Sequence, residues 1–404
     1  MPPWYYPAEA FDAVYAVSDL HGDVEVALSL FCNVLAVVER RQGFWVWSAP
    51  PRTCVVICGD TVDRSRRHGH GGPLYGENDL QDTQPDDLYL LRLLNHWAFL
   101  ADTANNGGKL LRLIGNHEVH GAEDDGPITY VSTHSARLLW RCVERLVPAP
   151  KDPNDQREKQ GVWLANRRAS FSTLGGAYFR AIWYERSAHV LIQIGPFLFT
   201  HAGVTHETVD CGIDPDDMRS MVREYMLRLR PSLPTGVQDI MFTRQYNTTS
   251  ESPNPGVVAR SVVDRWTGAF DRHTSMLVVG HNATTPGTVY RASADAAILI
   301  HTRRVTGSIP RTYDTPEPAH SFFLDPAAPW INASADDDGR PSVWRVDVAA
   351  SRAWWTVDPH WVVWPQALRC NPQTGETAAV IAEAPIGIRL RTAVFPEDPG
   401  GLPQ

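Results

Sequence analysis

The sequence predicts an α/β fold, in which short buried strands alternate with helices. Five apolar runs end abruptly in side chains that can bind metal ions, and they read AVYAVSDLHGD, CVVICGDTVDR, LLRLIGNHE, PFLFTHAG and MLVVGHN. An apolar run of about four to eight residues, bounded by Gly or polar residues, is typical of a buried strand. The segments between the first three runs have apolar residues at helical spacing. The expected order there is therefore strand, helix, strand, helix, strand.

The first helix is expected directly after the first run. Residues 23–41 read DVEVALSLFCNVLAVVERR, with apolar side chains three and four positions apart. Asp23 is a suitable N-cap residue. The run Glu39-Arg40-Arg41 brings two cations, the arginines, to the expected C-terminal end, where the helix dipole favours positive charge.

Further elements follow in order along the chain. A second strand is expected from Thr53 to Gly59, and a second helix from Asp86 to Ala101 with its apolar residues on one face. Right-handed crossovers make the first three strands parallel. More helices are expected from Ser135 to Val147 and from Pro215 to Leu229, the latter with Asp214 as its cap. Near the C-terminus, SVWRVDVAASRAWWTV indicates two strands around a short turn.

One catalytic domain is expected over residues 1–365. Surface insertions are expected at about 65–85, at 149–161 and at 302–341, because these stretches are long, polar or rich in Gly and Pro. Residues 366–404 are expected to form a Pro-rich C-terminal extension.

Composition argues against two classes of partner. Lys and Arg number 37 against 46 Asp and Glu, a formal charge of −9, whereas a nucleic-acid partner requires a basic surface. No run approaches the roughly 18 apolar residues of a membrane helix. The start, MPPWYYPAEAFD, lacks the regions of a secretion signal, and the six cysteines have no paired spacing. A cytoplasmic protein with reduced cysteines is expected.

Side chains that bind metal ions are expected to meet where the five strands end. Strands of an open α/β sheet deliver side chains to a crevice beyond their carboxyl ends, so residues far apart in the sequence can converge. The ligand-type residues at these endings are Asp19, His21, Asp60, Asn116, His201 and His281. A set of His, Asp and Asn without thiolates suits divalent ions such as Mn, Fe and Zn.

These ligands can be divided between two ions. Asp19 and His21 are alternate residues at a strand end, so they can point the same way and share one ion. Asp60 has two carboxylate oxygens and can bridge both ions. We therefore expect Asp19, His21 and Asp60 on one ion, and Asp60, Asn116, His201 and His281 on the other. Ions ~3.5–4 Å apart clamp the attacking and leaving oxygens of an in-line displacement, and a bridging water becomes hydroxide at neutral pH.

Three further side chains suit phosphoryl chemistry. His117 is adjacent to a ligand but is not assigned as one, and it is well placed to protonate the leaving oxygen. Asp63 can hold the imidazole of His117 in orientation. Arg64 can grip phosphoryl oxygens in a bidentate way that Lys cannot copy. The residues alone therefore predict a hydrolase with a dinuclear metal centre.

The motifs SDLHG, GDTVDR, GNHE, THAGV and VVGHN, in this order, resemble those of the calcineurin-like metallophosphoesterases. GNHE is similar to the motif of the phosphoprotein phosphatase branch. Three longer stretches resemble the Shewanella-like, bacterial-type protein phosphatases, namely residues 173–204, 240–247 around Arg244, and 343–354.

The resemblance implies both a fold and an activity. The implied fold is a sandwich of two mixed β-sheets flanked by helices. The implied activity is metal-dependent phosphomonoester hydrolysis by direct attack of a metal-bridging hydroxide, with Mn expected and Fe or Zn as alternatives. Phosphoproteins or phosphopeptides carrying phosphoserine, phosphothreonine or phosphotyrosine are the implied substrates. Arg244 is implied to be a second phosphate clamp, so the phosphate is expected to contact Arg64, Asn116 and Arg244.

Two other functions remain open at this point. A dinucleoside-polyphosphate hydrolase or a phosphodiesterase would use the same chemistry on another substrate. A phosphate-binding scaffold would keep the site without turnover, although the complete ligand set favours an enzyme.

Overall fold

The computed structural model describes residues 3–63, 86–123, 133–184, 187–246 and 254–281. It also describes shorter segments, which are 291–292, 296–297, 303–304, 332–335, 338, 341–345, 361–363, 366–381 and 386–387. Arg64, the expected insertion 65–85, most of the expected insertion 302–341 and most of the second half of the expected C-terminal strand pair lie outside the described residues.

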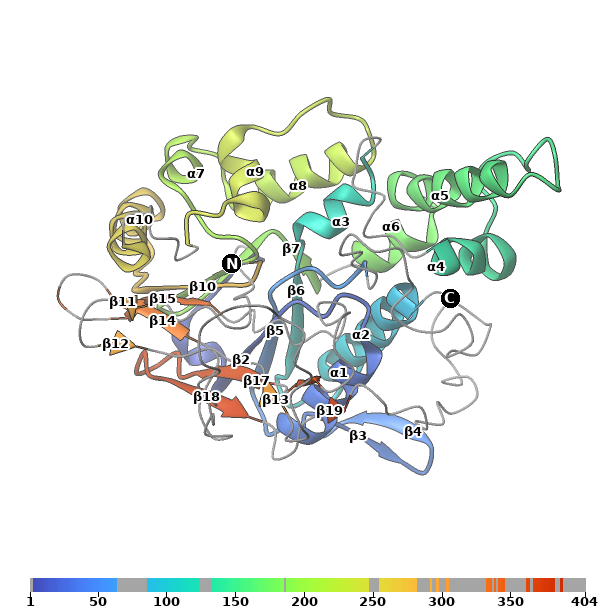
Figure 1. Ribbon diagram of the computed structural model, residues 1–404. Helices are drawn as coiled ribbons and strands as arrows, with labels where there is room; N and C mark the ends of the chain where they lie inside the picture. The colour runs from blue at the N-terminus through green and yellow to red at the C-terminus, as the bar shows by residue number, and fades with distance from the viewer. Residues whose placement is uncertain are drawn as a thin grey trace, which may run out of the picture.

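Within the described residues, six strands form a mixed sheet, here called the first sheet, in the order β18-β17-β2-β5-β6-β7. The bounds are β2 Ala13–Val17, β5 Thr53–Ile57, β6 Lys109–Leu113, β7 Ala188–His189, β17 Gln366–Cys370 and β18 Thr377–Ile381. Strands β2, β5, β6 and β7 are parallel, and β17 runs antiparallel to β2 and to β18. The parallel arrangement expected for the first three apolar runs is confirmed (Figure 1).

Six further strands among the described residues form the second sheet, in the order β1-β8-β9-β10-β15-β14. The bounds are β1 Tyr5–Tyr6, β8 Leu191–Ile194, β9 Phe197–Thr200, β10 Met276–Val279, β14 Asn332–Ala335 and β15 Pro341–Arg345. Strands β9, β10 and β15 are parallel, whereas β8 and β14 are antiparallel to their neighbours β9 and β15. The last two apolar runs of the sequence therefore end on the same edge of this sheet.

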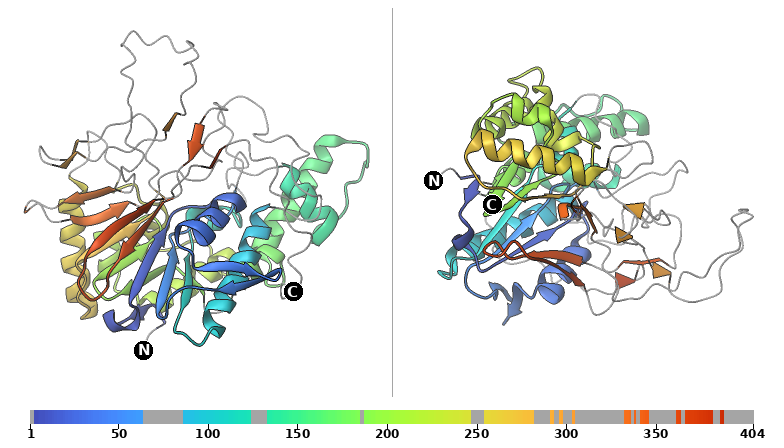
Figure 2. Two further views of the ribbon diagram at one scale, coloured as in Figure 1. Left: turned by 90° about the horizontal axis from the view of Figure 1, so that it is seen from below. Right: turned by 90° about the vertical axis from the view of Figure 1, so that its left-hand side faces the viewer.

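Helices cover the outer faces of both sheets (Figure 2). Two lie on the first sheet, α1 Val24–Leu28 and α2 Asp86–Thr103. Four lie on the second sheet, α7 His206–Asp210, α8 Pro215–Met226, α9 Thr235–Phe242 and α10 Pro255–Phe270. A projecting group consists of α4 Thr133–Leu138, α5 Gln156–Ser172 and α6 Ala177–Ile182, and the short α3 Asn116–His120 directly follows β6 (Figure 1).

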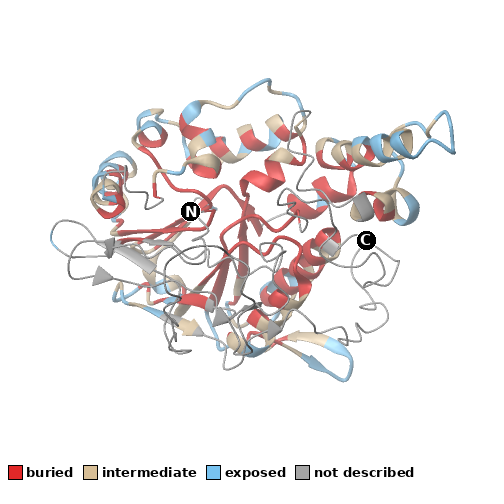
Figure 3. Cartoon of the chain, viewed as in Figure 1, coloured by how far each residue is buried: buried red, intermediate tan, exposed pale blue. Residues whose placement is uncertain are grey.

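Alternating side chains of the second sheet hold the layers together. Phe197 and Phe199 belong to the apolar cluster that also contains the core of the first sheet. Leu198, which lies between them, belongs to the cluster that contains α7 to α10. Successive side chains of a strand point to opposite faces, so one face of β9 packs against the first sheet and the other packs against the helices. Fully burying such a side chain contributes roughly 1.5–3 kcal/mol, and Figure 3 shows burial concentrated in these inner layers.

The predicted fold class is confirmed, since two mixed sheets pack face to face with helices outside. The predicted N-caps Asp23 and Asp214 both accept hydrogen bonds from the first turns of their helices. In the described part of the chain, no helix has the length and apolar character required to cross a membrane. All six cysteines lie in described residues, and none of them forms a disulfide.

The expected first helix is wrong in its second half. Helix α1 ends at Leu28 and continues only as a π-helical turn over Ser29–Val34. Ala36 then takes a left-handed backbone with φ of +49°. Residues Val38–Arg41, expected at the helix end, form strand β3 and pair with β4, Phe44–Trp47. The residues between them, Gln42 and Gly43, have φ of +53° and +89°, as a two-residue hairpin turn requires.

The expected domain boundary at residue 365 does not coincide with the edge of the folded unit. Gln366–Cys370 pairs with β2 in the middle of the first sheet, and Thr377–Ile381 forms the next strand. The first sheet therefore extends to Ile381. In the expected insertion 149–161, residues 151–157 are exposed, but α5 begins at Gln156 with Asp155 as its N-cap.

Candidate metal centre

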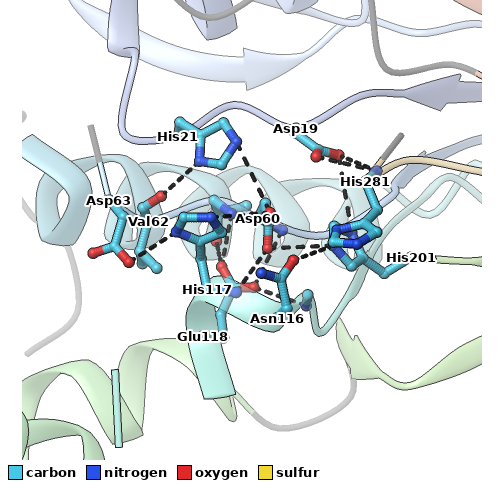
Figure 4. Close-up of polar contacts among 12 residues, drawn as sticks. Asp19, His21, Asp60, Val62, Asp63, Asn116, His117, Glu118, His201 and His281 are labelled. Carbon is cyan, nitrogen blue, oxygen red and sulfur yellow. Dashed lines mark hydrogen bonds and ion pairs between the residues drawn. The ribbon is translucent and has the colours of Figure 1, made fainter. Parts of the chain in front are cut away.

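Three ligand-type side chains lie together at one end of the first sheet. Asp19, Asp60 and Asn116 follow β2, β5 and β6, which are parallel and in register, with Val17 paired to Ile57. Each of the three residues is at most 8% exposed. The convergence expected at the carboxyl ends of these strands is present (Figure 4).

Backbone hydrogen bonds join the loops that follow β2 and β5. The N–H groups of Leu20 and His21 donate to the carbonyl oxygen of Asp60 at 3.1 and 2.8 Å. The buried His21 ring has Nδ1 3.1 Å from the carbonyl oxygen of Val62. With Nδ1 as the donor, Nε2 keeps its lone pair and faces Asp60 Oδ2 at 3.9 Å.

Glu118 anchors the loop that carries Asp60. Its buried carboxylate accepts hydrogen bonds from the N–H groups of Asp60 at 3.2 Å, Thr61 at 2.7 Å and Gly115 at 2.8 Å, and from the Thr61 hydroxyl at 2.7 Å. Burial and the neighbouring Asp60 raise the pKa of Glu118, and these hydrogen bonds oppose that shift. No role was predicted for Glu118, although its place in GNHE is a signal that could have identified it.

His201 and His281 reach the same point from the second sheet. They follow the parallel neighbours β9 and β10, and their ring centroids are 4.9 Å apart. His201 Nδ1 lies 2.6 Å from the carbonyl oxygen of Cys58, so it donates there and leaves Nε2 without a proton. This Nε2 is 3.4 Å from Asp60 Oδ1 and 2.9 Å from Asn116 Oδ1.

Two glycines allow the sheets' loops to approach this closely. A Cβ on Gly59, which has φ of +98°, would overlap the His201 ring. A Cβ on Gly115 would overlap the carboxylate of Asp60. The glycine that precedes each ligand in GD and GN is therefore needed for space as well as for the turn.

Within the described residues, two groups of three side chains could each hold a metal ion. One group is His21, Asp60 and His117, and the other is Asp60, His201 and His281, with the possible ligand atoms of each group within 4.8 Å of one another. Asp60 belongs to both groups. Its Oδ2 faces His21 and His117 at 3.9 and 3.8 Å, and its Oδ1 faces His201 at 3.4 Å.

Asp19 and His117 lie differently from the expected division of ligands. The D-x-H spacing predicts Asp19 beside His21, but the Asp19 carboxylate accepts from the backbone N–H of His281 at 3.2 and 3.4 Å. It also lies 3.9 Å from His201 Nδ1. Residues 19 to 21 lie beyond β2, which ends at Val17, and His21 has a left-handed backbone with φ of +43°, so the alternation of a strand does not apply to this pair. His117, expected outside the ligand set, falls in the group with His21.

The lone pairs at the centre of the site fit a bound cation. With Nδ1 of His201 as the donor to Cys58, the Nε2 of His201, an oxygen of Asp60 and the amide oxygen of Asn116 present lone pairs to one another. His281 Nε2 is buried and has no hydrogen-bond partner among the described residues. A buried polar atom without a partner costs about 1–3 kcal/mol and is rare in proteins. A divalent ion suited to N and O ligands would supply the missing partner.

The protonation states agree with this fit. Burial alone raises the pKa of Asp60, but the positive charges that His201, His117, His21 and His281 carry when they are protonated outweigh it, and the net pKa is lowered. Burial, reinforced by His201, lowers the pKa of His281 to about 2. An ionised carboxylate and a neutral imidazole are the forms that bind metal ions.

His117 and Asp63 form a hydrogen-bonded pair beside the two groups. His117 Nδ1 lies 3.0 Å from Asp63 Oδ2, and both side chains are buried. Arg167 Nη2 donates to the other carboxylate oxygen of Asp63 at 2.6 Å. Burial alone raises the pKa of Asp63, but Arg167 and His117 reverse that effect and lower it. The two side chains that the sequence analysis paired are in contact, and no pattern in the sequence indicated Arg167.

Several side chains of the site stand on a left-handed backbone. Among the described residues, His21, Asp60, Asp63 and His281 have φ of +43°, +46°, +68° and +59°. This conformation costs a non-glycine residue on the order of 1 kcal/mol or more, and such strain gathers at functional sites. The fold holds these four side chains in place against a local preference.

Of the two arginines expected to bind phosphate, only Arg244 is described. It is exposed and follows α9. Burial is the main cause of the lowered pKa of His281, and the charge of Arg244 contributes to it. Arg244 makes no ion pair with a described residue, so no carboxylate in that part of the chain neutralises it.

Comparison with known proteins gives structural similarities. The chain matches no protein-family model and no curated protein. It is similar to the cold-active protein-tyrosine phosphatase of the psychrophile Shewanella sp., with 17% identity and a TM-score of 0.47 over 94% of this chain and 82% of that chain. It is also similar to a protein serine/threonine phosphatase from Saccharomyces cerevisiae, with 15% identity and a TM-score of 0.36 over 70% of this chain and 65% of that chain. Both of these proteins are described as protein phosphatases.

Proposed function

We propose that this chain is a metal-dependent phosphomonoesterase of the protein phosphatase type, with two divalent ions. The observation that carries the proposal is the position of Asp60, whose two carboxylate oxygens face two different groups of buried ligand-type side chains. Mn is the first metal to test, with Fe and Zn as alternatives.

We assign the ligands as Asp19, His21 and Asp60 for one ion and Asp60, Asn116, His201 and His281 for the other. When bound, such a pair of ions acidifies water and neutralises charge on a phosphoryl group. The chain prepares for this through its own hydrogen bonds. Glu118 fixes the Asp60 loop, and the carbonyl of Cys58 fixes the tautomer of His201.

His117 holds the proton that the leaving oxygen takes up. Its Nδ1 is bonded to the Asp63 carboxylate, which favours the charged imidazole. Its Nε2 is on the side of Asp60, towards the centre of the site. A proton at Nε2 can therefore pass to an oxygen that leaves from this point, a contribution of roughly 10²–10⁴ to the rate.

The substrate phosphate is bound by Arg64, Asn116 and Arg244 in this proposal. Arg244 is exposed, and its charge acts on His281, so it lies at the boundary between solvent and the site. The resemblance of GNHE to the phosphoprotein phosphatase branch supports a phosphorylated Ser, Thr or Tyr side chain as the substrate. An exposed guanidinium suits a phosphate carried on a flexible peptide.

The first experiment compares substrates on the metal-loaded protein. Phosphoserine, phosphothreonine and phosphotyrosine peptides, 4-nitrophenyl phosphate, bis(4-nitrophenyl) phosphate and a dinucleoside polyphosphate would be supplied with Mn²⁺. We expect turnover of the monoesters. Faster turnover of the diester or the polyphosphate would replace the proposal with those activities. Phosphate binding without turnover of any substrate would leave a scaffold.

The second experiment separates ligands from the proton donor. His117→Asn should retain the metal content of the parent protein and lose roughly 10²-fold or more in kcat, most with poor leaving groups. Asp19→Asn should lose metal. If His117→Asn loses metal and Asp19→Asn keeps it, the group that contains His117 is the ligand set, and our assignment of the acid is wrong.

A further inference from the structure

Arg167 is a buried charge that the proposed chemistry does not use. It lies on α5 and is 3% exposed, and its Nη2 contacts two carboxylates at once. One is Asp63 at 2.6 Å, the partner of His117, and the other is Asp87 at 3.0 Å, at the start of α2. The guanidinium also packs over the rings of Phe171 and Tyr178, with 4.7 and 5.0 Å to their centroids.

Asp87, the second carboxylate that Arg167 contacts, is itself held by several hydrogen bonds. Asp87 accepts hydrogen bonds from the Tyr178 hydroxyl on α6, from the Ser135 hydroxyl on α4 at 3.2 Å, and from Arg167. Four helices therefore meet at one carboxylate. Through Arg167 this cluster is connected to Asp63, and through Asp63 to His117.

Packing alone is a weak reason for this arrangement. Removing a guanidinium and two carboxylates from water is costly, and apolar side chains of the same volume usually stabilise a core as well or better. The charged contacts instead give orientation. Each oxygen of Asp63 has its own partner, Oδ2 with His117 and Oδ1 with Arg167, so the carboxylate cannot rotate without losing both.

The need for such a constraint is visible in the backbone. Asp63 has a left-handed backbone with φ of +68° in the loop after β5. Arg167 thus provides a contact to Asp63 that comes from a helix more than 100 positions further along the sequence.

We propose that Arg167 is a positioning residue, which, together with Asp87, holds Asp63 so that His117 presents Nε2 to the leaving oxygen. This rests on the proposed function of His117 as proton donor. A planar guanidinium stacked on two rings is required, because Lys would supply a point charge without the stacking.

The test compares Arg167→Met with Arg168→Met, which removes the same charge from the next position of α5. Metal content, KM and kcat are measured with 4-nitrophenyl phosphate and with a phosphoserine peptide. For Arg167→Met we expect unchanged metal content and KM, a fall in kcat of about 10–100-fold on the phosphoserine peptide, and less than about threefold on 4-nitrophenyl phosphate, whose leaving group needs little protonation. Arg168→Met should behave as the parent protein. Equal losses on both substrates, or a change confined to KM, would overturn the proposal.

A second readout does not depend on turnover. In metal-free protein with ¹⁵N-labelled histidine, the Nδ1 proton of His117 should give an exchange-protected signal that is identified by its loss in His117→Asn. We expect this signal to persist in Arg168→Met and to disappear or exchange rapidly in Arg167→Met. A protected, unshifted signal in Arg167→Met would overturn the positioning role.

These readouts separate the two proposals. If the parent protein hydrolyses no monoester, the proposed function fails, while the proton signal still decides whether Arg167 positions His117. If Arg167→Met does not fold, Asp87→Asn and Arg167→Lys are measured in the same way. We expect each to show the same selective loss on the phosphoserine peptide at reduced size, and no selective loss in either would overturn the proposal.

Discussion

The two sides of the site differ in how their polar groups are satisfied. On the His117 side, formed by His21, Asp63, His117 and Glu118, the side chains are bonded to other groups of the protein. On the His281 side, formed by His201 and His281, a buried imidazole nitrogen has no partner among the described residues. Asp60 stands between the two sides and faces both.

This difference indicates which side the fold completes by itself. A side chain whose hydrogen bonds are all made within the protein is held in one orientation before any ligand arrives. A buried atom without a partner lowers stability until something binds to it. We therefore infer that the contacts on the His117 side stabilise the fold and orient the proton donor. The unsatisfied nitrogen on the His281 side instead lowers the stability of the protein until a ligand binds there.

Replacing the shared residue should have the largest effect. Asp60→Asn removes the charge that both sides face and should lose metal and activity together, with kcat/KM falling on the order of 10³-fold or more. The fold should survive, because Glu118 binds the backbone N–H of residue 60 and not its side chain. Elemental analysis and turnover of 4-nitrophenyl phosphate are the measurements. Normal metal content with full activity would show that Asp60 is not shared.

Next in size should be the loss of a contact on the His117 side. Glu118→Gln places an NH₂ group among donors that now point at a carboxylate, namely the N–H groups of Asp60, Thr61 and Gly115. Leaving such buried groups unpaired costs about 1–3 kcal/mol, and we expect a decrease of about 2–3 kcal/mol in the free energy of unfolding of the metal-free protein. Urea denaturation measures it. Glu123→Gln is the matched control, at a half-buried residue that follows α3. Its expected loss is smaller, and equal losses would contradict the anchoring role.

A smaller effect is expected at the exposed edge. Arg244→Ala should lower kcat/KM by roughly tenfold through KM, as for the loss of one charge-assisted hydrogen bond. Metal content should not change, and stability should stay within about 0.5 kcal/mol because the residue is exposed. Initial rates over a range of phosphopeptide concentrations test this. An unchanged KM would remove Arg244 from phosphate binding.

Much of this site could be predicted from the sequence because the signals are local. An apolar run followed by Gly and a polar residue indicates both a buried strand and what it delivers at its end, as for Asp60 after β5 and Asn116 after β6. Right-handed crossovers then make those ends meet. The same reasoning covers His201 and His281 at the ends of β9 and β10.

Other features depend on contacts between distant segments and could not be predicted in this way. The strand Val38–Arg41 forms because it pairs with Phe44–Trp47. The helical spacing of the preceding residues predicted a helix that continued through it. The Gln-Gly turn between the two strands was the overlooked signal. The contact of the Asp19 carboxylate with the backbone N–H of His281 joins residues that are 262 positions apart. Arg167 reaches Asp63 from α5, a contact that no spacing encodes.

The change in the free energy of unfolding should be small when the unsatisfied nitrogen itself is removed. His281→Asn removes the buried imidazole, and Asn tolerates the left-handed backbone that His281 adopts at φ of +59°. In the metal-free state at pH 7, the free energy of unfolding of the variant should therefore lie within about 1 kcal/mol of that of the parent protein, in contrast to Glu118→Gln. It should also bind Mn²⁺ more weakly, seen as a smaller increase in Tm when the ion is added.

The free energy of unfolding should fall more steeply with decreasing pH in the parent protein than in His281→Asn. Burial lowers the pKa of His281 to about 2 in the folded state, whereas an unfolded His titrates near ~6.5. The unfolded state therefore binds a proton below pH ~6.5 that the folded state does not, so the contribution of neutral His281 to stability is complete above that pH and is lost as the pH falls. The parent protein should lose up to ~1.4 kcal/mol per pH unit more than His281→Asn, or about 1 kcal/mol between pH 6.5 and 5.5. If the free energies of unfolding of the two metal-free proteins depend on pH in the same way over this range, His281 is not held neutral by the fold. The contrast between the two sides of the site would then fail.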